Sequence, residues 1–265
     1  MRDLTQENMV KSVGRALDII RLISNSRNGM GVTEIANQMD INKSSVYRIL
    51  ATLAQYGYVE KDHEHEKYKL GYTFLDIGAR LLESIDLRKE AMPYLLQLEE
   101  ETNEVIHLVV YDQGEVVYIE KLEGTELMRM HSQVGKRAPM HCTSVGKAIL
   151  AYLPEEKVKE ILSEKGMPAH TEYTYTNEED LFQDLQRIRQ YGYALDLEEN
   201  EYGITCVAIP LFDYNNHVCA AVSVSGSTIR MTKEKMEKLY PRMTEIGQQI
   251  SLRLGCKMSF PSEKK

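Results

Sequence analysis

Apolar positions near the start of the chain recur every three or four residues, the period at which side chains share one face of an α-helix. Residues 13–23 show this pattern at Val13, Ala16, Leu17, Ile20 and Ile23. The pattern predicts a first amphipathic helix, which ends before the turn-forming sequence SNSRNGMG.

Two short helices are predicted directly after this turn. Thr33 is suited to cap the first, which runs through Met39, because its hydroxyl can accept a hydrogen bond from a free amide. Asp40 to Asn42 forms a turn, and Asn42 caps a second helix that ends near Gly57. Two helices joined by so short a turn indicate a helix-turn-helix.

The pattern changes to strands after the second of these helices. GYVEKD and EKYKLG are expected to form a hairpin around HEHE at residues 63–66. A helix, a helix-turn-helix and a hairpin in this order predict a winged helix. His63 and His65 would lie on one side of a strand, but two ligands are too few for structural zinc, so a solvated wing tip is favoured over a metal site.

Two more amphipathic segments, residues 72–82 and a helix after Ser84 that runs to Glu101, are expected to link this module to a second domain. Pro93 is expected to kink or bound the second segment. Beyond it, strands are predicted at VIHLVVYD, GEVVYIEKL and LMRMHSQVG.

Helices and strands are mixed in the last half of the chain. Helices are expected over 144–152 and 154–164, then from Thr176, which forms a capping box with Glu179, and from Thr232 onward to Leu254. TCVAIPLF and VCAAVSVSG flank DYNNH as a hairpin. This mixture predicts an α+β fold.

The register of this last hairpin places polar side chains on one inward face. With an Asn-Asn turn, Cys206 faces Ser225, Ser223 follows on the same side, and Cys219 lies beside Phe212. Two buried hydroxyls and a thiol need hydrogen-bond partners, and a bound polar ligand would supply them.

The charge of the chain is uneven along its length. The formal net charge is -8, yet residues 1–70 hold ten Lys and Arg against nine Asp and Glu, and residues 71–265 hold 22 against 31. The second helix of the helix-turn-helix carries Lys43 and Arg48 and no acid, so its exposed face is basic. Acidic charges farther away are screened within about 8 Å at physiological salt.

The outward face of that helix is predicted to bind double-stranded DNA. Arg48 can form two hydrogen bonds to guanine, and hydroxyl groups can contact phosphates and base edges. The alternatives are a helical pair that only packs and a winged helix that binds proteins. The expected DNA-binding residues are Thr33, Asn42, Lys43, Ser44, Ser45, Tyr47, Arg48 and Thr52.

Other functional classes find little support in the sequence. Nucleotide-binding glycine motifs and the nucleophile elbow of hydrolases are incomplete, so an enzyme that uses Cys142 or Cys206 is a minority alternative. We expect no catalytic site, no cofactor and no metal. The four cysteines are widely spaced and are expected to be free thiols. No apolar run has the roughly 18 residues that a membrane helix needs, so a cytoplasmic location and no membrane partner are expected.

The sequence MHCTSVGKAILAYL places small polar residues before an apolar helix. Backbone amides near Ser144, Val145 and Gly146 would then be free to bind a carboxylate. An ordinary capped helix is the alternative.

Taken together, several segments resemble the IclR family of bacterial transcriptional regulators. They are SVGRALDII, TEIANQMDINKSSVYRILATLAQYGYVEKD, LGYTFLDIG, PMHCTSVGKAILAYLP, GYALDLEENEYGITCVAIPLFD and AAVSVSGS, in this order over nearly the whole chain. The resemblance implies a winged helix-turn-helix over residues 1–71, a linker helix over 72–88, an effector-binding domain with a GAF-like sheet over 89–257, and a tail over 258–265.

The resemblance also implies function. A regulator of this family, for which we favour a repressor of catabolic genes over an activator, binds an operator as a homodimer or homotetramer and responds to a small organic acid, here a keto or sugar acid. Residues at matching positions are expected to bind the effector: Leu127, Ala138, Ser144, Val145, Asp196, Ile204, Cys206, Ser223 and Ser225.

Overall fold

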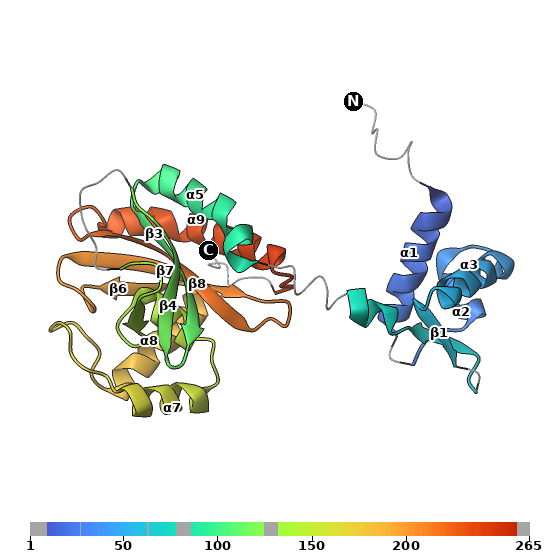
Figure 1. Ribbon diagram of the computed structural model, residues 1–265, viewed down its shortest axis with the longest axis horizontal. Helices are drawn as coiled ribbons and strands as arrows, with labels where there is room; N and C mark the ends of the chain where they lie inside the picture. The colour runs from blue at the N-terminus through green and yellow to red at the C-terminus, as the bar shows by residue number, and fades with distance from the viewer. Residues whose placement is uncertain (1–9, 27, 63, 78–85, 125–131, 259–265) are drawn as a thin grey trace. The chain divides into compact units, whose positions relative to one another are not determined.

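The chain packs as two compact units, Met1–Ile85 and Asp86–Lys265, each with its own hydrophobic core (Figure 1). The computed structural model describes residues 10–26, 28–62, 64–77, 86–124 and 132–258. Because residues 78–85 lie outside the described part, the bounds of the linker helix remain a prediction.

The N-terminal unit is a three-helix module followed by a hairpin. These elements are α1 (Lys11–Ser24), α2 (Val32–Met39), α3 (Lys43–Gln55), β1 (Val59–Asp62) and β2 (Lys67–Leu70), and residues 73–77 after the hairpin are helical as well. The two strands pair antiparallel. The predicted winged helix is therefore confirmed.

The apolar period of the helices produces the core of this unit. Ile19 of α1, Ile35 of α2 and Leu50 of α3 have no exposed surface, and Tyr68 of the hairpin packs into the same cluster. The three helices are thus held around one small core, and α3 keeps its opposite side exposed.

The helix starts in this unit agree only in part with the sequence. Asn42 caps α3 as predicted, because its Oδ1 accepts the Ser45 amide hydrogen at 2.8 Å. The prediction that Thr33 caps α2 is wrong, since the helix begins at Val32. Glu34 reaches back and accepts the Gly31 amide hydrogen at 2.8 Å, so a carboxylate satisfies the first orphan donor instead.

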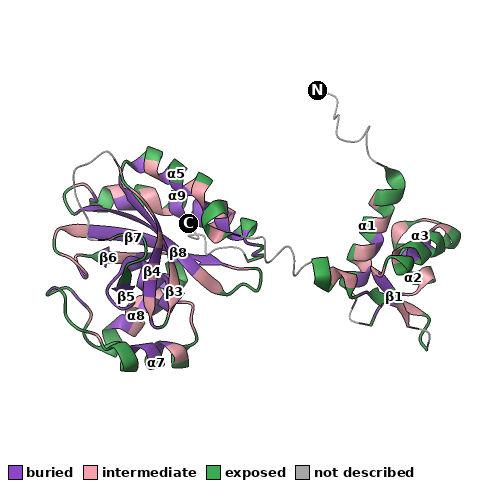
Figure 2. Cartoon of the chain, viewed as in Figure 1, coloured by how far each residue is buried: buried purple, intermediate pink, exposed green. Residues whose placement is uncertain are grey.

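The C-terminal unit is built on an antiparallel sheet of six strands in the order β5-β4-β3-β8-β7-β6. Figure 2 shows buried residues concentrated on these strands. The strands are β3 (Val105–Asp112), β4 (Glu115–Leu122), β5 (Arg137–Pro139), β6 (Ala194–Leu197), β7 (Ile204–Phe212) and β8 (Val218–Ser227).

Helices cover both faces of the sheet (Figure 1). The helices α5 (Leu87–Thr102) and α9 (Lys233–Arg253) pack together on one face. On the other, α6 (Ser144–Leu150) contacts β6, β7 and β8, with α8 (Glu178–Tyr191) against it and α7 (Glu155–Lys165) in the same core. The predicted α+β class is confirmed.

Three sequence expectations in this unit have different outcomes. Most of the strand expected at 127–135 lies outside the described residues, and its described end, residues 132–135, is not a strand. Pro93 lies inside α5 and does not bound it, and the alternative that it kinks the helix stays a prediction. The prediction that Thr176 caps α8 is wrong, because Asn177 is the N-cap residue and its Oδ1 accepts the Asp180 amide hydrogen at 2.9 Å.

The β7–β8 hairpin has the predicted register over most of its length. Cys206 pairs with Ser225, and Ser223 follows on the same face. The prediction that Cys219 lies beside Phe212 is wrong, because an irregularity between Leu211 and Phe212 shifts the pairing by one residue.

The four cysteines are free, as expected. Among the described helices, none has both the length and the apolar character needed to cross a membrane.

A fully buried lysine connects segments on the face of the sheet that α6 and α8 cover. Lys147 of α6 has no exposed surface, and its ammonium lies 2.9 Å from Asp184 Oδ2 and 2.6 Å from Glu199 Oε1. Asp184 belongs to α8 and Glu199 follows β6, so one cation joins three parts of the chain. The Tyr175 ring lies 4.7 Å from the ammonium and completes the cage.

Replacing this lysine should therefore be costly. Lys147→Met keeps most of the volume but removes the cation from the buried Glu199 carboxylate and leaves Asp184 paired with Arg187 alone. This change should lower the free energy of unfolding by about 3–5 kcal/mol. Chemical denaturation of the full chain measures the change. Lys157→Met is the matched control, because Lys157 pairs with Glu160 on the surface of α7. Similar losses in the two variants would contradict a special role for Lys147.

Candidate functional site

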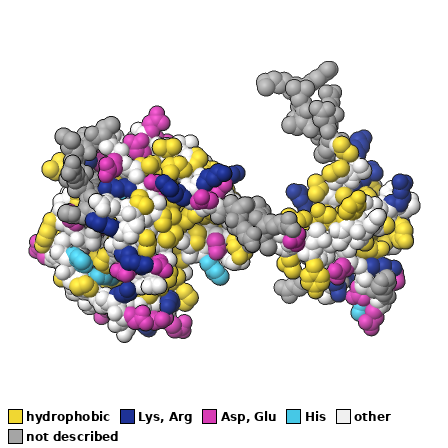
Figure 3. Space-filling model, viewed as in Figure 1, with side chains coloured by type: hydrophobic (Ala, Val, Ile, Leu, Met, Phe, Trp, Pro, Cys, Tyr) yellow, Lys and Arg dark blue, Asp and Glu magenta, His cyan; other side chains and the backbone are white. Residues whose placement is uncertain are grey.

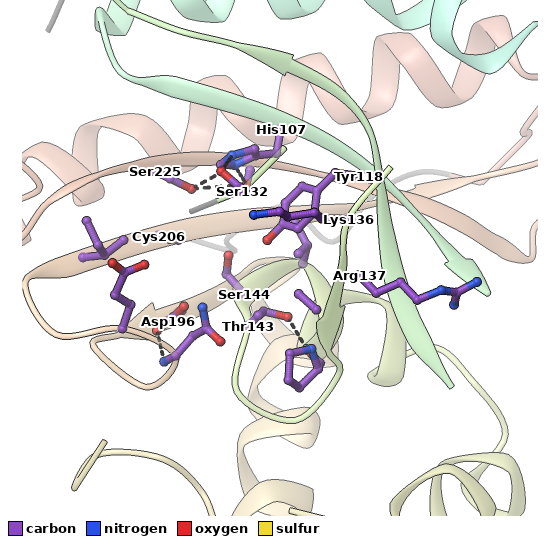
Figure 4. Close-up of a pocket in the computed structure, with 17 residues that line it drawn as sticks. His107, Tyr118, Ser132, Lys136, Arg137, Thr143, Ser144, Asp196, Cys206 and Ser225 are labelled. Carbon is purple, nitrogen blue, oxygen red and sulfur yellow. Dashed lines mark hydrogen bonds between the residues drawn. The ribbon is translucent and has the colours of Figure 1, made fainter. Parts of the chain in front are cut away.

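A cavity of about 250 Å³ lies in the C-terminal unit between the sheet and the start of α6 (Figure 4). Leu127 lies outside the described residues. The structure brings the other predicted effector-binding residues together in its wall: Ala138, Ser144, Val145, Asp196, Ile204, Cys206, Ser223 and Ser225.

Strand pairing sets the order of the polar side chains across this wall. Asp196 of β6 pairs with Cys206 of β7, which pairs with Ser225 of β8. On the other side of β8, Ser223 pairs with His107 of β3. Residues directly opposite in adjacent strands point to the same face. Residues far apart in sequence thus form one polar row.

His107 was missed by the sequence reasoning. Its Nδ1 lies 3.3 Å from the hydroxyls of both Ser223 and Ser225, and its Nε2 lies 2.8 Å from Ser132 Oγ. The serines therefore have a protein partner, so their hydrogen-bonding needs do not by themselves indicate a ligand. A single polar residue inside the apolar strand VIHLVVYD was the available signal.

The imidazole of His107 is uncharged. Burial, together with the nearby positive charge of Lys121, lowers the pKa of His107 to about 3. A neutral ring carries one donor and one acceptor, so it can organise the two hydroxyls without adding charge to the cavity.

Residues at the start of α6 form part of the cavity wall. Thr143 Oγ1 donates to the Pro139 carbonyl at 2.7 Å and accepts the Gly146 amide hydrogen at 3.1 Å. The expectation that the Gly146 amide is free is therefore wrong. A Cβ at Gly146 would lie 2.4 Å from the Met140 carbonyl oxygen, so only glycine permits this close approach beside the cavity.

Asp196 is the buried acid of the cavity. Its Oδ1 accepts the amide hydrogens of Glu199 at 2.8 Å and Asn200 at 3.3 Å. Burial and the neighbouring Glu199 carboxylate raise the pKa of Asp196 from 3.8 to about 7, although Lys147 opposes this shift. The side chain therefore changes charge near neutral pH. The hydrogen bonds from the Glu199 and Asn200 amides both go to Oδ1 and not to Oδ2.

Two cationic residues in the wall were also missed. Figure 4 shows the Lys136 ammonium directed into the cavity beside Tyr118. Arg137 extends away from the cavity, where its guanidinium pairs with Asp112. Lys136 therefore adds a cationic group to a wall for which the sequence indicated only backbone amides, hydroxyls, a thiol and an acid. Nothing in the local pattern around GKRAP distinguished the two residues.

The buried thiols do not have the state that nucleophilic catalysis requires. Burial raises the pKa of Cys142 and of Cys206 above the ordinary thiol value, and Asp196 adds to both shifts. The thiolate is the reactive form of cysteine, and these thiols remain protonated at neutral pH.

The second candidate site is the outward face of α3. The side chains of Lys43, Tyr47 and Arg48 are exposed, and neither cation forms an ion pair with another described residue. Thr33, Ser44 and Thr52 are exposed as well, and Ser45 is half-buried.

Some of these polar groups already have local partners. The Ser44 hydroxyl donates to Asn42 Oδ1 at 3.0 Å, and the Thr52 hydroxyl donates to the Arg48 carbonyl at 3.0 Å. Asn42 therefore has a structural role at the helix start. Lys43, Tyr47 and Arg48 are the groups most available for an external partner.

A groove of about 660 Å³ runs between α1 and α3. Tyr47, Arg48 and Thr52 line it, and Arg15 of α1 adds a cation that the sequence reasoning missed. Figure 3 shows Lys and Arg side chains over the helices of this unit and acidic side chains gathered at its hairpin end.

The wing itself is not basic. Lys61 pairs with Glu66 at 2.5 Å, and Lys69 pairs with Asp62 at 3.1 Å. His63 lies outside the described residues, and His65 Nδ1 lies 3.2 Å from Asp62. Within the described hairpin and α3, the cations without an ion pair are therefore those of the helix.

Sequence comparison connects both sites to one family. The model of the IclR helix-turn-helix domain matches residues 12–63, and that of the bacterial transcriptional regulator IclR C-terminal domain matches residues 79–252. The chain belongs to the IclR family of bacterial transcriptional regulators. It is a DNA-binding transcriptional regulator, and the matched helix-turn-helix domain contains α2 and α3.

Individual relatives agree over almost the full length. The HTH-type transcriptional regulator KdgR of Escherichia coli (strain K12) is 35% identical over 94% of this chain and 95% of its own. The transcriptional repressor IclR of the same organism is 33% identical, over 93% and 90%. The crystal structure of Thermotoga maritima IclR is 34% identical with a TM-score of 0.63, over 94% and 100%. These names agree with a regulator and not an enzyme.

The shifted pKa of Asp196 predicts a pH-dependent stability. Between pH 4 and pH 7, roughly, the folded chain keeps a proton that the unfolded chain has lost, so the free energy of unfolding falls as pH rises through this window. Asp196→Asn has no carboxyl group that titrates at this position, so its free energy of unfolding does not show this decrease. Its melting temperature relative to wild type should therefore rise from about pH 5 to about pH 8. Glu164→Gln, at an exposed position of α7, is the control, and identical profiles for the two variants would contradict the burial effect.

Proposed function

We propose that the chain is a transcriptional repressor whose C-terminal cavity binds a small, hydroxylated organic acid. The observation that carries the proposal is the cavity wall, in which a cation, a buried acid and several hydroxyls surround about 250 Å³. Repression is supported by the relative that is named a repressor and is 33% identical.

The wall favours an effector with a carboxylate at one end and hydroxyl or keto groups at the other. Lys136 and the Ser144 hydroxyl can bind a carboxylate, and Asp196 can accept hydrogen bonds from effector hydroxyls. The serines held by His107 can donate or accept, which suits a keto or sugar acid. An aromatic acid would offer few hydrogen-bond donors or acceptors to this polar wall, so a keto or sugar acid fits it better.

The effector signal must change the affinity for DNA. As a homodimer or homotetramer, the protein would present two recognition helices to half-sites about 34 Å apart, or a multiple of this distance. An effector that binds one arrangement of the dimer better than another shifts the population toward it. The linker segment would transmit this change to the winged helices.

Arg48→Ala should weaken operator binding by about ten- to a hundredfold, because a bidentate contact to guanine contributes about 1–3 kcal/mol. DNA selected by the wild-type chain from a random pool supplies the operator, and fluorescence anisotropy supplies the affinity. Arg21→Ala is the matched control, because Arg21 lies in the last turn of α1 and does not line the α1–α3 groove. Equal losses in both variants would indicate only general attraction to DNA.

The effector site is tested by a double substitution. A thermal-shift screen over small hydroxy, keto and sugar acids should first identify an acid that raises the melting temperature. Ser223→Ala with Ser225→Ala should then lower the affinity for that acid by about tenfold or more, because two hydrogen bonds to it are lost. Operator affinity without the acid should stay at the wild-type value.

The matched control for this double variant is Ser163→Ala on the exposed side of α7. It should leave acid binding unchanged. Unchanged affinity of the folded double variant, measured by titration calorimetry, would show that the acid binds elsewhere.

A further inference from the structure

A group of metal-binding side chains lies outside the effector cavity. One ring nitrogen each of His141 and His170 and the sulfur of Cys142 lie within 4.8 Å of one another. His141 and Cys142 are buried directly before α6, and His170 is exposed on the segment between α7 and α8. None of the three lines the cavity described above.

The His141 ring makes a hydrogen bond of a kind that is common among metal-binding histidines. Its Nε2 lies 3.1 Å from the Pro168 carbonyl oxygen. Because a carbonyl only accepts, Nε2 carries the proton and the lone pair remains on Nδ1. Histidines that bind metals commonly donate their other ring hydrogen to a backbone carbonyl or carboxylate in this way. The His141 and His170 rings are tilted by 43°, with centroids 6.1 Å apart.

Hydrogen bonds from its own residues hold the segment that carries His170 in place. The His170 amide hydrogen is donated to Thr174 Oγ1 at 3.0 Å. Thr174 and Thr171 in turn donate their hydroxyls to the carbonyls of Glu199 and Glu198, at 2.5 and 2.6 Å. An ion would therefore meet ligands whose backbone is already ordered.

The ligand set indicates which kind of ion fits. Two imidazoles and one thiolate suit borderline divalent ions such as Zn²⁺ and Co²⁺, and not Mg²⁺ or Ca²⁺, which prefer oxygen. We propose that His141, Cys142 and His170 bind one divalent transition-metal ion of the zinc type, with water as the fourth ligand beside the exposed His170. The Cys142 thiol releases its proton to solvent when the metal–sulfur bond forms.

Such an ion would connect two segments next to the cavity. Cys142 Sγ lies 3.7 Å from Asn200 Oδ1, and both Asn200 and Thr143 line the cavity. The ion would join the His170 segment to the start of α6. It should therefore raise the melting temperature of the C-terminal unit, because it binds the folded state.

The test is a Co²⁺ titration of the reduced, untagged, chelator-treated full chain. We expect one equivalent to produce a cobalt–thiolate charge-transfer band that Zn²⁺ then removes. Cys142→Ser should abolish the band. Replacing a residue that only hydrogen-bonds to a metal ligand typically lowers metal affinity by about tenfold or more. Loss of the ligand His170 in His170→Ala should therefore weaken Co²⁺ binding by at least about tenfold. Because His170 is exposed, its variant is expected to fold even if Cys142→Ser does not.

Matched controls are Cys219→Ser, a thiol on β8, and His217→Ala, an exposed histidine in the β7–β8 turn. Both should keep the band and the wild-type affinity. The proposal is overturned by the lack of a thiolate band, by its persistence in Cys142→Ser, or by equal weakening in His217→Ala and His170→Ala.

Discussion

The C-terminal unit depends on the pairing of one buried ammonium group, that of Lys147. A charge without exposed surface must be paired, and the two carboxylates that pair with it come from α8 and from the turn after β6. The backbone of that same turn donates two hydrogen bonds to Asp196, and its carbonyls accept the hydroxyls of Thr171 and Thr174. One ion cluster therefore fixes the acid of the cavity and the segment of the proposed metal site.

Separating charge between the units allows an acidic chain to bind DNA. Helix α3 carries Lys43 and Arg48 without acids, while the wing neutralises its own lysines. The excess of acidic residues belongs to the C-terminal unit, where Lys136 is directed into the cavity and Arg137 pairs with Asp112 outside it. In the proposed function, local charge would bind both the DNA phosphates and the effector, so the net charge of the chain says little about either partner.

The errors made from sequence have a common physical origin. Helix periods identified nearly every helix, but the caps were misplaced at Thr33 and Thr176, where Glu34 and Asn177 satisfied the free amides instead. A change of pairing at Phe212 displaced Cys219 from its predicted neighbour. These details depend on which of several nearby donors and acceptors form the hydrogen bond, and small differences in local geometry decide between them.

The sequence by itself determined the winged helix, the basic face of α3 and the α+β class, because these follow from local periodicity. With the family resemblance it also identified eight of the 17 residues that line the cavity. Only the tertiary structure showed that His107 binds the two serines, that Lys136 faces the cavity, and that His170 lies beside His141 and Cys142. Strand order and loop packing bring these residues together. Both depend on contacts between distant segments, which a single sequence does not encode as a local pattern.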